Sequence, residues 1–242
     1  MQVLSVDIQH AGYEAAQSVI RDIHFTVRQG ELVGIIGPNG AGKSTTIKAV
    51  MGLLDHVVGT TDLCGPNHNY AYIPEQPILY DRLTLWEHLR LAAAAHELSD
   101  DALHTTAIDL LRRFRLEHVI HHYPTSFSKG MQQKVMLIAG FMAKPDLYIV
   151  DEPFIGLDPH AMKDLLDILR EELLRGAGVI MSTHMLDTAE RICDRYLLIH
   201  QGTIAATGTL QDIRMHCSMP EGSLLDCYTT ICARSDDVYE DA

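Results

Sequence analysis

The chain has 242 residues, 47% of them hydrophobic and 21% charged, which is the composition of a folded globular protein and excludes extended disorder. Its 19 basic and 32 acidic side chains leave a formal net charge of -13, which argues against nucleic-acid binding and against direct docking on anionic lipid. No apolar stretch approaches the roughly 20 residues that span a bilayer, the N-terminus lacks a basic signal-peptide start, and the five cysteines are scattered without CxxC pairs, so we expect a soluble cytoplasmic protein that reaches a membrane only through a partner.

Strand and helix patterns alternate along the chain. Apolar alternation predicts strands over 2–9 and 23–27, and a continuous apolar run predicts a buried strand over 32–36. Helical spacing follows over 43–54 and again throughout the stretch from about 77 to 145, where the expected helices are 85–96, 100–114 and 129–143. Beyond it we expect strands over 147–150, 179–182, 195–200 and 203–206, and helices over 160–174 and 186–193.

This order of elements predicts an α/β core with a mainly parallel sheet, interrupted by a helical insertion. Gln201-Gly202, between the last two expected strands, is a hairpin turn signal. The segment after Cys217 has weak periodicity and ends in acidic residues. We therefore expect a tail that is frayed or ordered only by a partner.

A phosphate-binding loop is the strongest motif. Residues 37–45 read Gly-Pro-Asn-Gly-Ala-Gly-Lys-Ser-Thr and match G-x-x-x-x-G-K-[ST] between an expected strand and an expected helix. Backbone N–H groups of such a loop and the positive end of the following helix bind phosphate, the lysine neutralises the β and γ phosphates, and the serine hydroxyl ligates Mg²⁺. The residues expected to contact a nucleotide are Gly37, Asn39, Gly40, Gly42, Lys43, Ser44 and Thr45.

Two adjacent carboxylates form the second motif. The apolar run 147–150 is followed by Asp151 and Glu152, at the carboxyl end of an expected strand, where ligands bind in open α/β sheets. We expect Asp151 to hold Mg²⁺ through water and Glu152 to accept a proton from the attacking water. Taken alone, the pair is also compatible with an ordinary acidic turn.

A third segment narrows the choice among phosphate-loop proteins. Residues 127–134 read Phe-Ser-Lys-Gly-Met-Gln-Gln-Lys and resemble the signature of ATP-binding cassette (ABC) ATPases, usually Leu-Ser-Gly-Gly-Gln. Ser128 and Gly130 match, whereas Lys129 and Met131 depart from the commonest form. A hydroxyl at a helix start and a glycine beside it favour contact with a phosphate, although without the resemblance Ser128 is simply a helix N-cap.

Further positions resemble the same family. Tyr13 resembles the aromatic residue that stacks on adenine, Asp158 lies in a loop expected to cross a dimer interface, and His184 resembles the switch histidine that contacts the γ-phosphate. The remaining switch usually carries Gln, which reaches Mg²⁺ and the attacking water. Here Glu75 and Gln76 are adjacent, and the sequence leaves open which of them fills that place.

The resemblance covers about residues 2–215 and implies the ABC ATPase fold. That fold is a P-loop NTPase of the α/β class: a RecA-like core with a mainly parallel sheet, an antiparallel β subdomain and an α-helical subdomain. We therefore expect one ATPase domain over 1–215, its helical subdomain at about 77–145, and a C-terminal tail over 216–242 that is acidic at its end.

The resemblance also implies a mechanism. Two copies bind ATP head to tail, so that Lys43 of one copy and Ser128 of the other enclose each nucleotide. Glu152 activates water, with His184 and the switch residue beside the γ-phosphate. The residues that the family implies for Mg²⁺ are Ser44, Asp151 and Glu75.

Several short strings resemble the Ecs-type exporters within the family, among them Tyr-Ile-Pro-Glu at 72–75 and Met-Ser-Thr-His at 181–184. This implies a homodimer bound to a polytopic, EcsB-like permease at the cytoplasmic face of the membrane, and export of peptides. Residues 75–80 and 84–89 resemble the groove that receives a permease helix. Trp86, the only tryptophan, is equally compatible with an exposed interface and with a core anchor.

Other functions compete with this one. A soluble ABC ATPase that acts on ribosomes or DNA usually carries two cassettes or a long insertion, and this chain shows neither and is acidic. An importer subunit has a similar cassette, so only the Ecs-like strings favour export. A kinase or GTPase would leave the signature segment unexplained.

Overall fold

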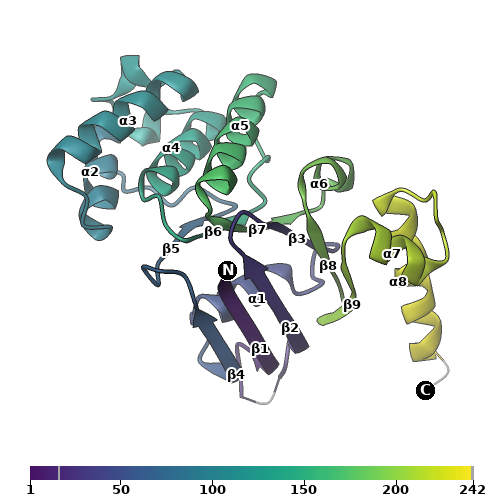
Figure 1. The fold of residues 1–242 in the computed structure, drawn as a ribbon. Helices are drawn as coiled ribbons and strands as arrows, with labels where there is room; N and C mark the ends of the chain where they lie inside the picture. The colour runs from purple at the N-terminus through teal and green to yellow at the C-terminus, as the bar shows by residue number, and fades with distance from the viewer. Residues whose placement is uncertain (16, 241–242) are drawn as a thin grey trace.

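The computed structural model describes residues 1–15 and 17–240, with side chains up to residue 233. Two sheets organise this part of the chain (Figure 1), a six-stranded sheet in the order β5-β6-β7-β3-β8-β9 and a three-stranded sheet in the order β2-β1-β4. The strands are β1 Gln2–Gly12, β2 Ile20–Arg28, β3 Leu32–Ile36, β4 His56–Leu63, β5 Tyr70–Ile73, β6 Leu147–Asp151, β7 Gly178–Thr183, β8 Arg195–His200 and β9 Thr203–Gly208.

Helices cover the six-stranded sheet on both faces. Figure 1 shows α2 to α5 together on one side, α1 on the side of the smaller sheet, and α6 to α8 near β8 and β9. The helices are α1 Lys43–Val50, α2 Leu85–Ala95, α3 Asp100–Phe114, α4 Lys129–Met142, α5 Pro159–Arg175, α6 Leu186–Ile192, α7 Leu210–Cys217 and α8 Leu224–Glu240. The predicted α/β core, antiparallel sheet and helical subdomain are all present.

The larger sheet is parallel from β5 to β8 and ends in the antiparallel strand β9. Strands β3, β6 and β7 are buried along their whole length, as expected of parallel strands covered on both faces. The hairpin between β8 and β9 turns at Gln201 and Gly202, both with positive φ (45° and 79°), which confirms the predicted turn.

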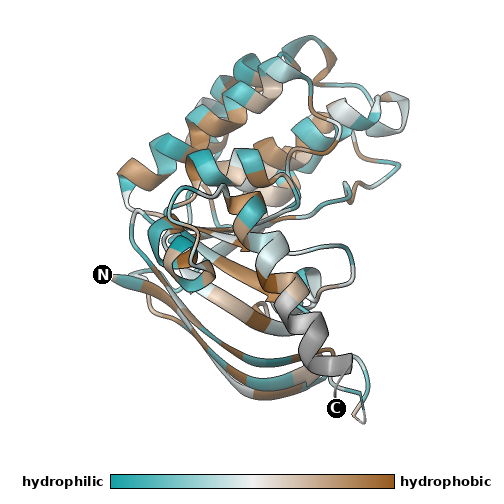
Figure 2. Ribbon diagram, turned by 90° about the vertical axis from the view of Figure 1, so that its right-hand side faces the viewer, coloured by the Kyte–Doolittle hydropathy of each residue, from teal (hydrophilic) through white to brown (hydrophobic). Residues whose placement is uncertain are grey.

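Two hydrophobic clusters lie on opposite faces of the larger sheet. One fills the space between the two sheets and includes Ile47 of α1 and Ile149 of β6. The other joins the helical subdomain to the sheet and includes Val150, the next residue of β6. Successive strand residues point to opposite faces, so β6 contributes to both clusters. Figure 2 shows the hydrophobic colouring on the strands between the layers, whereas the helices alternate in colour.

The structure corrects the expectation of a frayed tail. Residues 224–240 form α8, and Leu224, Cys227 and Ile231 are buried against α7 and strand β8. Leu224, Cys227 and Ile231 follow helical spacing, but the polar residues between them made this periodicity weak in the sequence. The C-terminal segment therefore packs on the edge of the core, through a third cluster that includes Ile213 of α7.

The sequence patterns did not predict strands β4 and β5. Strand β4 is mostly exposed and contains Gly59 in a left-handed conformation (φ 138°), so it has little apolar alternation. Strand β5 has only four residues. Both depend on pairing with a neighbour, β1 for the former and β6 for the latter, and this pairing is a tertiary effect.

A buried network at the start of β6 yields a stability prediction. The hydroxyl of the fully buried Tyr148 donates to Glu172 Oε2 at 2.9 Å, and Arg175 Nε donates to the same oxygen at 2.7 Å. Tyr148→Phe removes one of these bonds while Arg175 still pairs the carboxylate. We expect the free energy of unfolding to fall by about 1–2 kcal/mol, measured by urea denaturation. An unchanged midpoint would show that the bond contributes nothing.

Candidate active site

The phosphate-binding loop joins β3 to α1 and curls around a lysine. Gly42, the N-cap of α1, has φ 109°, a conformation that strains any residue with a Cβ. Lys43 is buried, and its Nζ donates to the carbonyls of Gly37 at 2.8 Å and Pro38 at 3.3 Å. The loop thus holds the Lys43 ammonium group against its own backbone, at the positive end of helix α1.

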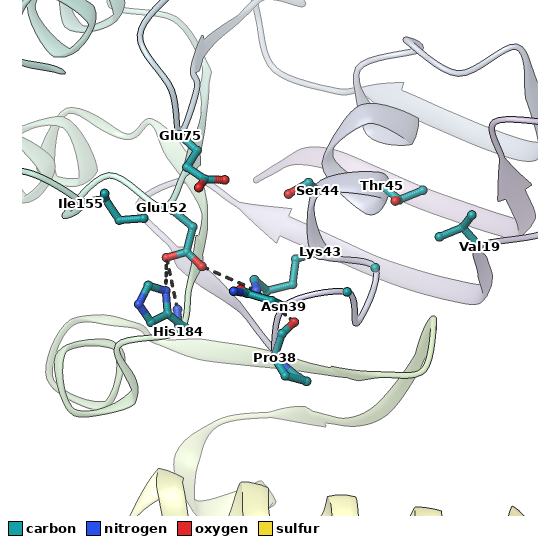
Figure 3. Close-up of a pocket in the computed structure, with 12 residues that line it drawn as sticks. Val19, Pro38, Asn39, Lys43, Ser44, Thr45, Glu75, Glu152, Ile155 and His184 are labelled. Atoms are coloured by element: carbon teal, nitrogen blue, oxygen red, sulfur yellow. Dashed lines mark hydrogen bonds and ion pairs between the residues drawn. The ribbon is translucent and has the colours of Figure 1, made fainter. Parts of the chain in front are cut away.

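This loop forms one wall of a cavity of about 410 Å³, a size that fits a small ligand (Figure 3). The opposite wall comes from the ends of β5, β6 and β7, because the carboxyl ends of parallel strands meet at one edge of the sheet. The lining residues are Val19, Pro38, Asn39, Gly40, Gly42, Lys43, Ser44, Thr45, Glu75, Glu152, Ile155 and His184.

Glu152 occupies the centre of this wall and is 6% exposed. Its Oε1 lies 3.6 Å from Lys43 Nζ, and its Oε2 lies 2.8 Å from His184 Nδ1 and 3.3 Å from the His184 backbone nitrogen. Figure 3 shows these contacts converging from the loop and from the end of β7. A buried carboxylate aimed into a cavity next to a phosphate-binding lysine is suitably placed to accept a proton.

Asp151 lies behind the cavity wall. It is 4% exposed and does not line the cavity, and its Oδ1 accepts a hydrogen bond from the buried Ser182 hydroxyl. Burial chiefly, and then the charges of Asp151 and Glu75, raise the pKa of Tyr72 to about 12. The carboxylates of Asp151 and Glu75 therefore both disfavour the ionised form of Tyr72.

The geometry separates the two candidates for the switch position. Glu75 lines the cavity, on the side facing Glu152 and Ser44 in Figure 3. Gln76 is exposed and does not line it. Of the two adjacent residues, Glu75 is therefore the one that can reach a ligand bound there.

Comparison with known proteins decides the family. A family model described as ABC transporter matches residues 20–155. Two Bacillus subtilis (strain 168) proteins align over nearly the full length: the uncharacterized ABC transporter ATP-binding protein YthP, 49% identical over 93% of this chain and 95% of the relative, and the ABC-type transporter ATP-binding protein EcsA, 44% identical over 94% and 96%. The chain belongs to the ABC transporter family.

A solved structure agrees with this. It is described as the ATP binding subunit of an ABC transporter and superposes with a TM-score of 0.89 at 46% identity, covering 95% of this chain and 99% of that one. The predicted family and fold are thereby confirmed: the chain is an ABC transporter ATP-binding subunit, and ATP hydrolysis is its enzymatic class.

Tyr13 lies beside the ABC phosphate-binding loop but outside the cavity lining. It is 52% exposed, and Lys48 Nζ lies 3.2 Å from its hydroxyl and 5.1 Å from its ring centroid. Hydrogen bonding with Thr45, and then with Lys48, lowers the pKa of Tyr13. The exposed ring is thus fixed next to α1, where a base attached to a bound phosphate chain could stack.

The signature segment also lies outside the cavity of its own chain. Ser128 is the exposed N-cap of α4 and accepts from Met131 N at 3.3 Å, the cap that its sequence position predicted. A Cβ on Gly130 would lie 2.6 Å from the carbonyl oxygen of Gly156, so this glycine allows α4 to approach the loop after β6. That close contact is a structural role which the sequence pattern did not reveal.

Asp158 anchors the same loop to α4. Its Oδ1 caps α5 by accepting from Ala161 N at 2.9 Å, and its Oδ2 lies 2.7 Å from Lys134 Nζ. The Lys134 hydrogen bond, and then the one from Ala161, lower the pKa of Asp158 to about 2. It does not line the cavity either.

This shifted pKa predicts an acid-dependent loss of stability. Because the folded-state pKa lies below the ordinary value of 3.8, the ionised carboxylate stabilises the fold above about pH 4, and this contribution disappears as the pH falls towards about 2. The side chain is half exposed, so solvent limits the contribution to under about 1 kcal/mol. Asp158→Asn keeps a capping side chain but loses the charge.

Thermal unfolding of the wild-type protein and of Asp158→Asn checks this. We expect the variant to be less stable at about pH 7 and the difference to shrink at about pH 3. A constant difference at both pH values would contradict the link between stability and this carboxylate.

Proposed function

We propose that this cavity hydrolyses MgATP to drive export through a polytopic membrane permease, with peptides as the cargo that the Ecs-type resemblance suggests. The observation that carries the catalytic part is the meeting of Lys43, Glu152 and His184 in one cavity, at the distances given above. These three come from separate segments of the chain, and each has the chemistry that phosphoryl transfer to water requires.

Lys43 neutralises negative charge on the β and γ phosphates at the end of α1. Glu152 accepts the proton of the water that attacks the γ-phosphorus, while the bond from phosphorus to the bridging oxygen breaks and ADP leaves. His184 orients Glu152 through Nδ1 and is positioned to contact the γ-phosphate. Tyr13 provides the stacking surface for adenine.

The oxygen-rich residues near the loop fit Mg²⁺, a hard cation that is usually held by one or two carboxylates together with substrate phosphates. Within the described residues, no group of three His, Cys, Asp or Glu side chains could hold a metal alone. Ser44, Glu75 and, through water, Asp151 would hold the ion. When bound, Mg²⁺ supplies charge neutralisation on the phosphates.

A head-to-tail homodimer explains the position of the signature. Ser128 and Gly130 lie outside the cavity of their own chain, and Ser128 presents a helix N-terminus and a hydroxyl outward. A second copy can bring this end of α4 over the first copy's nucleotide, where N–H groups stabilise phosphate. Asp158, in the loop packed on α4, would lie at the same interface.

A groove on the helical subdomain is suited to a membrane partner. It measures about 200 Å³ and is lined by Pro77, Leu79, Tyr80, Asp81, Pro124, Thr125 and Gln132. Large apolar side chains lie exposed nearby: Ile78 is 68% exposed, Tyr80 59% and Tyr123 51%. Exposed aromatic and apolar residues around a concave site favour protein docking.

Trp86 lies at the start of α2 and does not line this groove. It is partly buried against the helical cluster, and its ring lies 4.8 Å from that of His104. This favours the core-anchor interpretation over an exposed interface residue. Among the described residues no helix is long and apolar enough to cross a membrane.

The experiment uses a trapped complex. Tagged Glu152→Gln is incubated with ATP in native membranes and purified in mild detergent, which should keep the closed state while removing the base. Co-purification of a polytopic membrane protein in stoichiometric amount supports the proposal that the chain binds a permease at the cytoplasmic face of the membrane. Recovery of ribosomes or DNA instead would establish the soluble ABC ATPase, and uptake by the reconstituted complex would establish an importer.

A groove variant provides the control for that experiment. Ile78→Asp places a charge among exposed apolar residues and does not alter a residue of the nucleotide cavity. In the Glu152→Gln background we expect it to lose the membrane protein while still binding ATP. If Ile78→Asp retains the partner in full, the groove is not the docking site.

A further inference from the structure

The hydroxyl of Ser182 contacts both acidic residues at the carboxyl end of β6, Asp151 and Glu152. Ser182 is the register partner of Asp151 on the adjacent parallel strand β7 and is fully buried. Its Oγ donates to Asp151 Oδ1 and accepts from the Glu152 backbone nitrogen at 3.1 Å. One side chain thus contacts both residues of the carboxylate motif.

The Ser182 hydroxyl is a polar group in an otherwise apolar, buried part of β7. The residues before Ser182 on β7 are apolar and buried, including Val179, Ile180 and Met181. A buried hydroxyl is costly unless hydrogen-bonded, whereas alanine would fit a strand core without that cost. Here the hydroxyl donates one hydrogen bond and accepts another, which compensates for its burial.

The backbone at Glu152 depends on the same residue. Glu152 has φ 47°, in the left-handed region that non-glycine residues rarely adopt. Its N–H is directed at Ser182, with both the carbonyl oxygen and Oγ at 3.1 Å. This conformation aims the Glu152 carboxylate at the cavity, where His184 and Lys43 meet it.

Asp151 depends on Ser182 for its orientation. In the part of the chain that the structure describes, the side-chain hydrogen bond to the Asp151 carboxylate comes from Ser182. With Oδ1 fixed in this way, the Asp151 carboxylate would be oriented to help hold Mg²⁺ through water. Outer-shell partners of metal-binding carboxylates commonly contribute 10–100-fold to metal affinity or to activity.

We propose that Ser182 is a positioning residue of the ATPase site, one hydroxyl that aligns the metal-ordering carboxylate Asp151 and the general base Glu152 together. This rests on the proposed function, in which those two residues hold Mg²⁺ and accept the proton. Ser182 does not line the cavity. Because the same hydroxyl contacts both residues, its removal should disturb the orientation of Asp151 and of Glu152 at once.

The test compares Ser182→Ala and Ser182→Cys with the wild-type full-length chain. The cysteine is a weak hydrogen-bond donor and slightly larger than serine, whereas alanine is smaller, so a loss shared by both variants reports the hydrogen bond rather than packing. We expect kcat for ATP hydrolysis to fall about 10–100-fold in both variants, KM for ATP to change by less than about 3-fold, and the Mg²⁺ concentration for half-maximal rate to rise about 10-fold.

A second readout does not need turnover. Calorimetric titration with a non-hydrolysable ATP analogue, with and without Mg²⁺, measures how much the ion tightens binding. We expect Ser182→Ala to lose about 10-fold of that tightening while analogue affinity without Mg²⁺ stays unchanged. An unchanged Mg²⁺ effect would overturn the proposal.

Tyr148→Phe is the matched control, because it removes another buried hydroxyl that donates to a carboxylate, at the far end of the same strand β6. It should lose stability but keep kcat and the Mg²⁺ dependence. If Ser182→Ala merely behaves like Tyr148→Phe, Ser182 is structural and the inference is wrong.

Glu152→Gln, assayed in parallel, distinguishes a failure of the proposed function from a failure of the inference about Ser182. If it loses turnover while Ser182→Ala keeps it, the proposed function stands and this inference fails. If Glu152→Gln itself keeps wild-type turnover, the assignment of the base fails, and the inference fails with it.

Discussion

Glu152→Gln is expected to lower kcat for ATP hydrolysis by about 10²–10⁴-fold, the range that a general base contributes. The amide keeps the shape of the side chain but cannot take a proton at neutral pH. ATP affinity should be kept or increased, because the negative charge 3.6 Å from Lys43 Nζ is removed and the lysine is freed for phosphate. Single-turnover hydrolysis and equilibrium ATP binding measure the two effects separately.

The same variant should form an ATP-dependent dimer that elutes as a larger species on gel filtration, since hydrolysis no longer releases it. Glu172→Gln is the matched control: it also neutralises a buried glutamate, but one that pairs with Arg175 at the opposite end of the sheet. It should hydrolyse ATP at the wild-type rate. A Glu152→Gln chain that turns over normally would contradict the assignment of the base.

The second prediction concerns two inactive chains that restore each other. Lys43→Ala removes the phosphate-binding cation, and Ser128→Glu places a negative charge where the signature should meet phosphate, so each homodimer should be nearly inactive. In a head-to-tail heterodimer of the two, one site combines both defects and the other combines the intact Lys43 with the intact Ser128. An equal mixture should recover about a quarter of the wild-type rate if chains exchange freely and the sites act independently.

Differently tagged copies allow heterodimers to be counted in the same sample. Mixing Lys43→Ala with a Lys43→Ala, Ser128→Glu double variant is the control, because no intact site can form. The mixture of Lys43→Ala and Ser128→Glu could instead show only the summed ATPase rates of the two homodimers, despite confirmed exchange. In that case each site is complete within one chain, and the head-to-tail arrangement is wrong.

Local motifs made the catalytic half of the site predictable. The loop at 37–45 and the carboxylates after β6 lie at strand ends, and the topology of a parallel sheet brings strand ends together. The cavity contains most of the predicted loop residues together with Glu75, Glu152 and His184. The roles of Ser128, Gly130 and Asp158 stay predictions, because a single chain holds them away from its own cavity.

The remaining features depend on contacts that a linear pattern does not encode. Val19, Pro38 and Ile155 line the cavity without any chemical signature. Ser182 looked like part of a switch string, and only the pairing of β6 with β7 shows that its hydroxyl contacts the Asp151 carboxylate and the Glu152 backbone nitrogen. Likewise, the packing of α8 became visible only through the buried positions that it shares with α7.

The position of β3 governs when the site can assemble during synthesis. This strand carries the phosphate-binding loop and leaves the ribosome early, yet its sheet neighbours are β7 and β8, from the last third of the chain. Until those strands emerge, the apolar residues of β3 have no partner on either side, and the nascent chain must be protected from aggregation. ATP can stabilise the fold only after that point, so nucleotide acts as a late ligand of a nearly finished chain.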